Sequence, residues 1–156
     1  MTAELARLVL LANVVSTLVL VGVIWFVQIV HYPQFARVGR DGFAGYEAAH
    51  VRLTTWVVAP PMLIEALTSG VLAWQPPSPG LTLVCRGGLL LVIVIWLSTA
   101  ILQVPQHNVL ARSFDADAHR RLVASNWIRT ICWSLRGLLV VFLLAQLCLG
   151  VVQHGQ

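Results

Sequence analysis

Imidazole and carboxylate side chains, which bind transition metals or transfer protons, lie near the ends of four long apolar stretches of this sequence. Glu47 and His50 are three residues apart, so on a helix their side chains would lie side by side. Carboxylate-bridged metal sites in helical bundles use the same spacing. His31, His107 and His119 end or begin neighbouring stretches, and an antiparallel bundle would bring all of these residues to one side.

A metal centre is the first chemistry that this set of residues predicts. Neutral imidazoles with a carboxylate suit iron, copper or zinc, and a coordination position left open would accept dioxygen or a substrate. The predicted ligands are His31, Glu47, His50 and His107, with His119 as a substitute or an outer partner. Haem b held by His31 and His107 is a variant of the same hypothesis. Acid–base work without a metal, and plain hydrogen bonding of the histidines to headgroups and helix ends, stay open as alternatives.

Further polar residues fall inside the apolar stretches. Asn126 and Arg129 begin the last stretch, where they would orient a substrate, Arg129 through a bidentate contact with an anionic group. Glu65 and Arg136 lie at similar distances along their stretches, so their depths in a bilayer would match. Either charge alone would be costly in hydrocarbon, which predicts a buried ion pair. A structural clamp is the favoured role of this pair, and a proton or substrate site is the alternative.

The four stretches that position these residues are long enough to span a bilayer. Of the 156 residues, 58% are hydrophobic and only 10% are charged, and the mean hydropathy is +0.83. A soluble domain carries about a quarter charged residues. We therefore predict one all-α domain over residues 1–156, an integral membrane four-helix up-and-down bundle with both termini on the same side. Its helices are predicted at residues 5–31, 43–74, 82–104 and 116–152, with His154 in the tail.

The arginines predict the orientation of this bundle. All ten basic residues are Arg, and seven of them lie in or beside the first and third connections. The positive-inside rule places these connections in the cytoplasm and both termini on the periplasmic side, which predicts a multi-pass protein of the bacterial inner membrane. Because topology explains the basic residues, nucleic-acid binding is not expected. The expected partners are the lipid bilayer and a hydrophobic small molecule, and oligomerisation stays open.

Prolines predict where the helices end or bend. Tyr32-Pro33 is expected to end the first helix, and Pro105 the third, because proline disfavours helix at the residue before it. Pro60 and Pro61 are expected to kink the second helix. That kink would either open a pocket between helices or serve packing alone.

Two further local features concern a helix cap and the thiols. Ser113 or Asp115 is expected to cap the last helix. Cys85 and Cys148 would both lie near the outer face, where a disulfide is geometrically feasible. Buried unpaired thiols are the favoured alternative.

Short motifs of the chain resemble those of known membrane protein families. His31-Tyr32-Pro33, the segment of residues 43–52 and Pro61-Met62 resemble a family of small uncharacterised bacterial four-helix membrane proteins. More remotely, Pro105-Gln106-His107-Asn108 and the segment of residues 126–130 resemble the anthrone-oxygenase-like membrane family. The length and the Pro-Met step are also similar to four-helix membrane protoporphyrinogen oxidases, although this chain has no Lys to match the lysine of that family. The last two resemblances imply redox chemistry on a polycyclic or tetrapyrrole molecule.

Two hypotheses for function follow. The first is a membrane oxidoreductase or oxygenase-like protein with a His/Glu metal or haem site at the cytoplasmic membrane boundary. The second is a non-enzymatic membrane component without a cofactor, such as a transporter subunit, a lipid-binding protein or an assembly partner.

Overall fold

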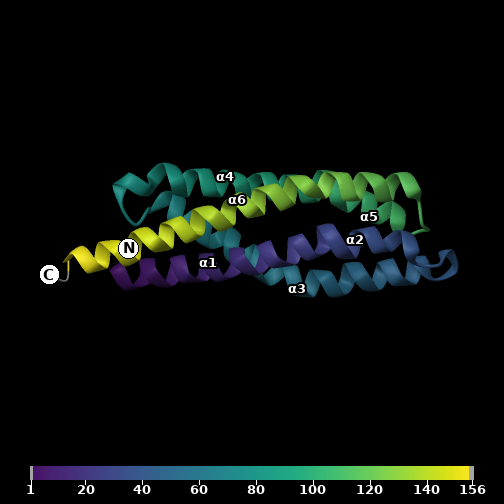
Figure 1. The fold of residues 1–156 in the computed structure, drawn as a ribbon, viewed down its shortest axis with the longest axis horizontal. Helices are drawn as coiled ribbons and strands as arrows, with labels where there is room; N and C mark the ends of the chain where they lie inside the picture. The colour runs from purple at the N-terminus through teal and green to yellow at the C-terminus, as the bar shows by residue number, and fades with distance from the viewer. Residues whose placement is uncertain (1, 155–156) are drawn as a thin grey trace.

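Long antiparallel helical rods make up the computed structural model, which describes residues 2–154 and the side chains of residues 2 and 4–148 (Figure 1). The first rod consists of α1 (Ala3–Phe26), a π-helical turn η1 (Val27–His31), α2 (Tyr32–Gln34) and a 3₁₀ turn η2 (Phe35–Arg37). The second rod is α3 (Arg40–Trp74). The third consists of η3 (Pro79–Leu81), α4 (Thr82–Ser98), a second π-helical turn η4 (Thr99–Gln103) and α5 (Val104–Leu110). The fourth is α6 (Ala116–His154).

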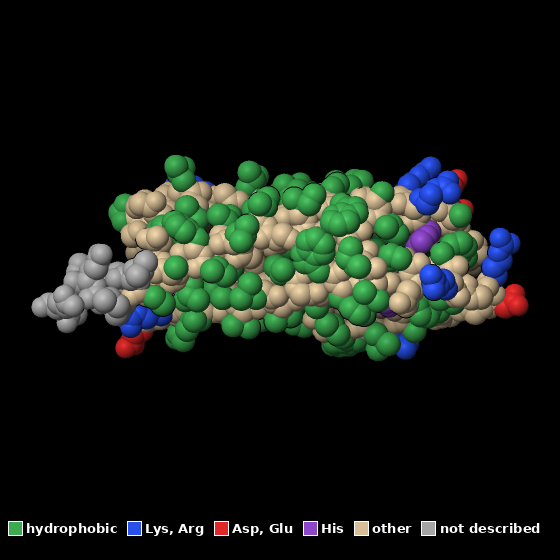
Figure 2. Space-filling model, in the orientation of Figure 1, with side chains coloured by type: hydrophobic (Ala, Val, Ile, Leu, Met, Phe, Trp, Pro, Cys, Tyr) green, Lys and Arg blue, Asp and Glu red, His purple; other side chains and the backbone are tan. Residues whose placement is uncertain are grey.

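The rods have the length and composition of membrane spans. Within the described residues, four helical segments are long and apolar enough to cross a membrane: Glu4–Arg37, Arg40–Trp74, Pro79–Leu110 and Ala116–Cys148. Figure 2 shows the charged side chains of this face at the two ends of the molecule, with apolar side chains covering the length between them. The start of α1 and the end of α6 lie at the same end of the bundle (Figure 1). The predicted all-α, up-and-down membrane bundle is therefore confirmed.

Polar side chains recur along one face of each rod, and these polar stripes point into the bundle. Buried polar side chains come from all four rods: Asn13, Thr17, Gln28, Glu47, Glu65, Gln103, Asn126 and Thr130 are each no more than 3% exposed. Large apolar side chains such as Leu83 and Leu138 are instead strongly exposed. This inside-out pattern is expected when lipid is the solvent, because unsatisfied polar groups are costly in hydrocarbon.

Two predicted helix ends were wrong, for the same physical reason. The first rod continues through Pro33 to Arg37, and the third continues through Pro105 to Leu110. Proline lacks an N–H and its ring clashes with the carbonyl four residues earlier. Those carbonyls belong to Ile29 and Ile101, and both residues lie inside π-helical turns. A π turn widens the backbone at this point, so the helix passes the proline without a break.

The second and fourth rods begin close to where the sequence predicts. Helix α3 starts at Arg40, three residues before the predicted start, and it continues through Pro60 and Pro61 to Trp74. Helix α6 starts at Ala116, where the Asp115 carboxylate accepts a hydrogen bond of 2.7 Å from the backbone N–H of Ala118. Asp115 is therefore the cap of α6. His154 ends α6, and its side chain lies outside the described residues.

The thiols are free within the described part of the chain. Cys85 and Cys132 are buried, whereas Cys148 is exposed. The disulfide considered between Cys85 and Cys148 is not formed, and the two buried thiols pack as small apolar groups in separate clusters of the core.

Candidate functional site

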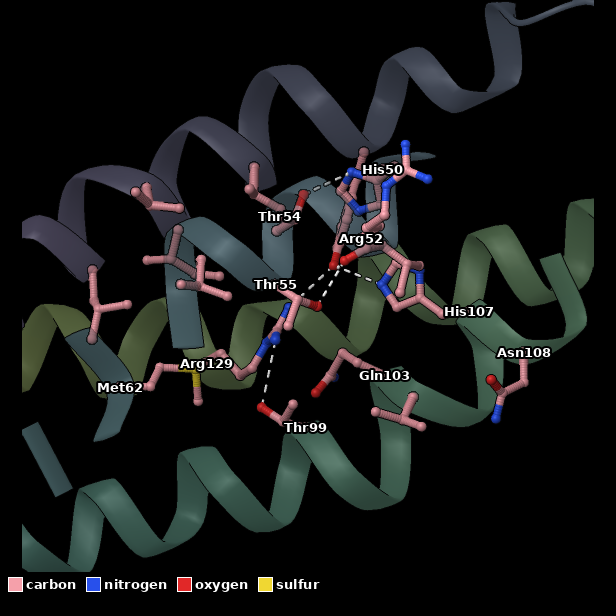
Figure 3. A pocket seen from close by; sticks show the side chains of 18 of the residues that line it. His50, Arg52, Thr54, Thr55, Met62, Thr99, Gln103, His107, Asn108 and Arg129 are labelled. Atoms are coloured by element: carbon pink, nitrogen blue, oxygen red, sulfur yellow. Dashed lines mark hydrogen bonds between the residues drawn. The ribbon is translucent and has the colours of Figure 1, made fainter. Parts of the chain in front are cut away.

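A pocket of about 400 Å³ lies in the half of the bundle that is nearer to the first and third connections. All four rods contribute to its wall, which extends along α3 from Ala48 to Met62. At the helical rise this stretch is about 20 Å long. Val58 and Met62, which flank the Pro60-Pro61 step, both line the wall. Figure 3 shows His50, Arg52 and His107 toward one end of the pocket and Met62 at the other, with Arg129 between them.

A continuous chain of hydrogen bonds leads from the pocket wall to a buried carboxylate. Arg129 Nη2 donates to the Tyr32 hydroxyl at 3.2 Å, and this hydroxyl lies 3.0 Å from His107 Nε2. His107 Nδ1 lies 2.5 Å from Glu47 Oε1. Tyr32, His107 and Arg129 line the pocket, whereas Glu47 is fully buried behind it. We call these four side chains the relay.

We assign the direction of the hydrogen bonds in the relay from the chemistry of its two ends. A guanidinium only donates hydrogen bonds, and an ionised carboxylate only accepts them. Because Arg129 donates to Tyr32, the Tyr32 hydroxyl proton points to His107 Nε2. His107 therefore carries its own proton on Nδ1 and donates it to Glu47. Every hydrogen bond points the same way, so a proton arriving at Tyr32 can pass to His107, whose imidazolium then faces the Glu47 carboxylate.

Glu47 also has an atom with no hydrogen-bond partner. Its Oε2 is the one buried side-chain oxygen or nitrogen, among the described residues, for which the structure provides none. A buried carboxylate oxygen without a partner is costly unless it takes up a proton, a water molecule or a cation.

Buried amides hold Arg129 in place. Asn126 accepts from Arg129 at both Nε, at 2.9 Å, and Nη2, and it donates to Gln28 at 2.8 Å. Gln28 in turn donates to the Val123 carbonyl of α6 and accepts a long bond from Thr130. This network ties η1 to α6. Asn126, predicted to orient a substrate together with Arg129, is fully buried and positions the arginine that lines the pocket.

The remaining predicted histidines form a second pair. His31 Nε2 and His50 Nδ1 lie 2.8 Å apart, and the Thr54 hydroxyl lies 3.1 Å from the same His50 nitrogen. The ring of His50 also stacks on that of His107, with 5.5 Å between centroids. His119 is separate, because its Nε2 donates to the Tyr32 backbone carbonyl at 2.8 Å. It supports the backbone of the relay and does not line the pocket.

The four predicted metal ligands therefore lie together but are paired with each other. Among the residues that the structure describes, no group of three or more His, Cys, Asp or Glu side chains is arranged to hold a metal ion. His31 pairs with His50, and His107 with Glu47. The free Oε2 of Glu47 is the feature of this set that suits a cation. Metal binding remains a prediction.

Glu65 and Arg136 meet at the depth that the sequence predicts. Arg136 Nε lies 3.2 Å from Glu65 Oε1, and both side chains are almost completely buried. Thr17 and Trp133 donate to the carboxylate, at 2.7 and 3.0 Å. Trp133 also lines the pocket, so this ion pair supports the inner end of the pocket wall.

Two pocket residues were missed in the sequence. In the sequence both stand out only as members of short motifs, Tyr32 in the Tyr-Pro step and Arg52 in the segment of residues 43–52, and neither is predicted as a site residue. Tyr32 lies four residues after Gln28, on the same polar stripe, so a helix continuing past His31 would have pointed to it.

No family model, no curated protein and no solved structure matches this chain. The family resemblances noted in the sequence therefore remain expectations.

Proposed function

We propose that this protein is a membrane enzyme that takes up a hydrophobic small molecule in the pocket and removes a proton from it through the relay. The observation that carries the proposal is the run of hydrogen bonds from Arg129 and Tyr32 in the pocket wall to buried Glu47. An acid–base group must lie within hydrogen-bond reach of its substrate and be oriented by a third group. His107, oriented by Glu47 and contacting the pocket through Tyr32, has this arrangement.

The division of labour within the relay follows from its geometry. Tyr32 and His107 would receive the proton, and Glu47 would stabilise the imidazolium that forms. Arg129 would stabilise negative charge on the substrate. The class of reaction that we propose is oxidoreductase or oxygenase-like, with dioxygen as the oxidant that accepts the electrons, and the family resemblances support it. The proposed location is the bacterial inner membrane, with the first and third connections in the cytoplasm.

This proposal can be tested with an assay that does not require the substrate to be known in advance. Purified protein in lipid nanodiscs would be incubated under air with an organic extract of bacterial membranes, in light and in heavy water. Mass spectrometry would then follow every molecule of the extract. We expect the wild type to change the mass of at least one apolar molecule, by gain of oxygen, loss of hydrogen or uptake of deuterium.

Matched tyrosine variants provide the control for this assay. Tyr32→Phe removes the relay hydroxyl and keeps the ring, and it should abolish the conversion. Tyr46→Phe makes the same change outside the pocket wall and should leave the conversion intact. Equal conversion by all three proteins, or no conversion by the wild type, would contradict the proposal.

A metal-dependent version is the second candidate, favoured by the unpartnered Glu47 Oε2. Glu47, His31, His50 and His107 would hold the ion, which would supply Lewis-acid or redox chemistry when bound. Elemental analysis and an absorption spectrum of protein purified from metal- and haem-supplied cells test this version. Stoichiometric metal that is lost in His31→Ala and His50→Ala variants supports it, and absence of metal and haem from the wild type rejects it.

The non-enzymatic alternative makes a different prediction. A membrane component without chemistry at the pocket should tolerate Tyr32→Phe and His107→Gln in any cellular assay. It should lose function on changes that unfold the bundle, such as Glu65→Gln.

A further inference from the structure

The wall of the pocket carries positive charge and no acidic side chain. Arg52 and Arg129 line it, and none of the described lining residues is Asp or Glu. Arg52 lies at the exposed margin, whereas Arg129 is only 9% exposed. A wall of this kind in a low-dielectric setting favours an anionic ligand.

Arg129 is a buried arginine without a carboxylate partner. The described residues form three salt bridges, and Arg129 takes part in none of them. Its hydrogen bonds go to neutral groups: Asn126, Tyr32 and Thr99. Glu47 reaches it only through His107 and Tyr32. A buried charge is costly unless it is paired, so an anion beside Arg129 would be strongly stabilised.

One nitrogen of the guanidinium, Nη1, is available to such an anion. Nε and Nη2 are engaged by Asn126 and Tyr32, but Nη1 makes only a long hydrogen bond of 3.4 Å to Thr99. A ligand oxygen at Nη1 would make a charge-assisted hydrogen bond, which is about twice as strong as a neutral one.

The rest of the pocket fits an apolar body. Beyond Arg129 the wall is apolar, and it is formed there by Leu20, Ile24, Val58, Met62 and Trp133. Figure 3 shows this gradient, with Met62 at the end opposite His50 and His107. An amphipathic molecule would place its charged end near the two arginines and its apolar end among these side chains.

The pocket margin is exposed where α3 faces the third rod. Val51 and Val104, on opposite margins, are 40% and 46% exposed, and Thr55 and Asn108 beside them are also exposed. This margin lies within membrane-spanning helices. A molecule dissolved in the bilayer can therefore reach the pocket sideways, without passing through water.

We infer that the ligand of this pocket is an amphipathic monoanion, with an apolar body and a single acidic head such as a carboxylate, that enters from the bilayer between α3 and α5. The inference rests on the proposed function, for which it names the class of molecule bound. The head meets Arg52 at the margin and pairs with Arg129 inside.

Photolabelling tests the inference. The probe is a fatty acid with a diazirine in its chain, compared with its methyl ester, on protein in phosphatidylcholine nanodiscs. Mass spectrometry compares labelling of the pocket walls in α3 and α5 with labelling of lipid-facing residues such as Leu83 and Leu138, which serve as the internal background. The acid should label the pocket about tenfold more than the ester does, because a hydrogen bond to a charged group contributes at least about tenfold in affinity.

Arginine variants separate the inference from its alternatives. Arg129→Gln should reduce labelling by the acid to the level of the ester, whereas Arg86→Gln, an exposed arginine outside the pocket wall, should leave it unchanged. If Arg129→Gln fails to fold, competition in the wild type decides, because unlabelled fatty acid should compete and its ester should not. Competition by phosphatidylglycerol as strong as that by the free acid would identify a lipid headgroup as the source of the anion.

The contradicting results are distinct. Equal pocket labelling by acid and ester would overturn the anionic ligand and leave the hydrophobic pocket of the proposed function standing. If neither probe labels the pocket above the lipid-facing background, the result would count against both the anionic ligand and the proposed function.

Discussion

Arg129 and Arg136 are two buried arginines on one face of α6, and their surroundings differ. Arg136 pairs with Glu65 and also donates to Asn13, Thr17 and Ser69, at 3.0 to 3.2 Å. Arg129 has only neutral partners and lines a pocket. Because a charge within the membrane needs a counter-charge, the first arginine is satisfied by the fold, and we expect the second to be satisfied by a ligand.

The ion pair should be strongly coupled. Glu65→Gln or Arg136→Gln alone leaves one buried charge unpaired and should lower the free energy of unfolding by about 3 kcal/mol. The free energy of unfolding of the double variant should fall by clearly less than the sum of the two single decreases, because neither charge remains. Unfolding of micelle-embedded protein by a denaturing detergent measures all four proteins, and additive losses would show that the pair does not interact.

Gly88 leaves the space that the Arg136 guanidinium occupies. A Cβ at Gly88 would lie 2.7 Å from Arg136 Nη1, whereas Gly87 has nothing within 4 Å. Because Glu65 and three further hydrogen-bond partners hold this guanidinium in place, Gly88→Ala should destabilise the protein by about 1–3 kcal/mol through overpacking. Gly87→Ala, the matched control on the neighbouring residue, should not destabilise it, and equal effects in a thermal unfolding assay would exclude this packing account.

At the scale of elements, the two π-helical turns explain how the site is assembled. Each precedes a proline, at Pro33 and Pro105, and each is followed within a few residues by a member of the relay, Tyr32 or His107. The helices therefore extend past the points where proline would end them, and they carry relay side chains inside the bundle. π turns inside helices are frequent at functional sites.

The same turns limit what could be predicted from the sequence. Regular helical spacing predicted Glu47, Glu65 and Arg136, because their rods, as far as the structure describes them, contain no π turn. His107 was predicted from its place just past the expected end of the third helix. Tyr32 was missed because a Tyr-Pro step ordinarily ends a helix, and no local pattern announces a π turn. The pairing of His107 with Glu47 also depends on packing between rods, which helical periodicity within one rod does not specify.

The start of α6 provides a test at the same scale. Asp115 accepts from the Ala118 N–H, so Asp115→Ala should cost about 1 kcal/mol of stability. Asp117→Ala removes a carboxylate of the same turn that pairs with Arg120 on the surface, and such pairs contribute little. Thermal unfolding in detergent compares the two variants, and an equal loss would mean that Asp115 is not the cap.

For the whole molecule, composition and the long apolar stretches were sufficient to predict the bundle. The four rods, their antiparallel order and the common side of the termini follow from hydropathy and short connections. The pocket could not be predicted in the same way, since its volume is what remains after side chains from all four rods pack together.

Orientation is testable on the intact molecule. The three native cysteines are first replaced by Ser. In this background Ser78→Cys, in the second connection, should react with a membrane-impermeant maleimide added to intact bacterial cells. A cysteine at Ser113 should react only after the cells are opened, because the arginine-rich connections are expected in the cytoplasm. The reverse labelling pattern would invert the proposed topology.

The proposed function depends on the direction of the hydrogen bonds in the relay, and the position of one proton on His107 tests that direction. Solid-state NMR of protein with isotope-labelled histidine, in lipid bilayers, reports which ring nitrogen of His107 carries hydrogen. We expect hydrogen on Nδ1, facing Glu47, with Nε2 accepting from Tyr32. The Nε2 signal should change in Tyr32→Phe but not in Tyr46→Phe. Hydrogen on Nε2, or an Nε2 signal indifferent to Tyr32→Phe, would contradict it.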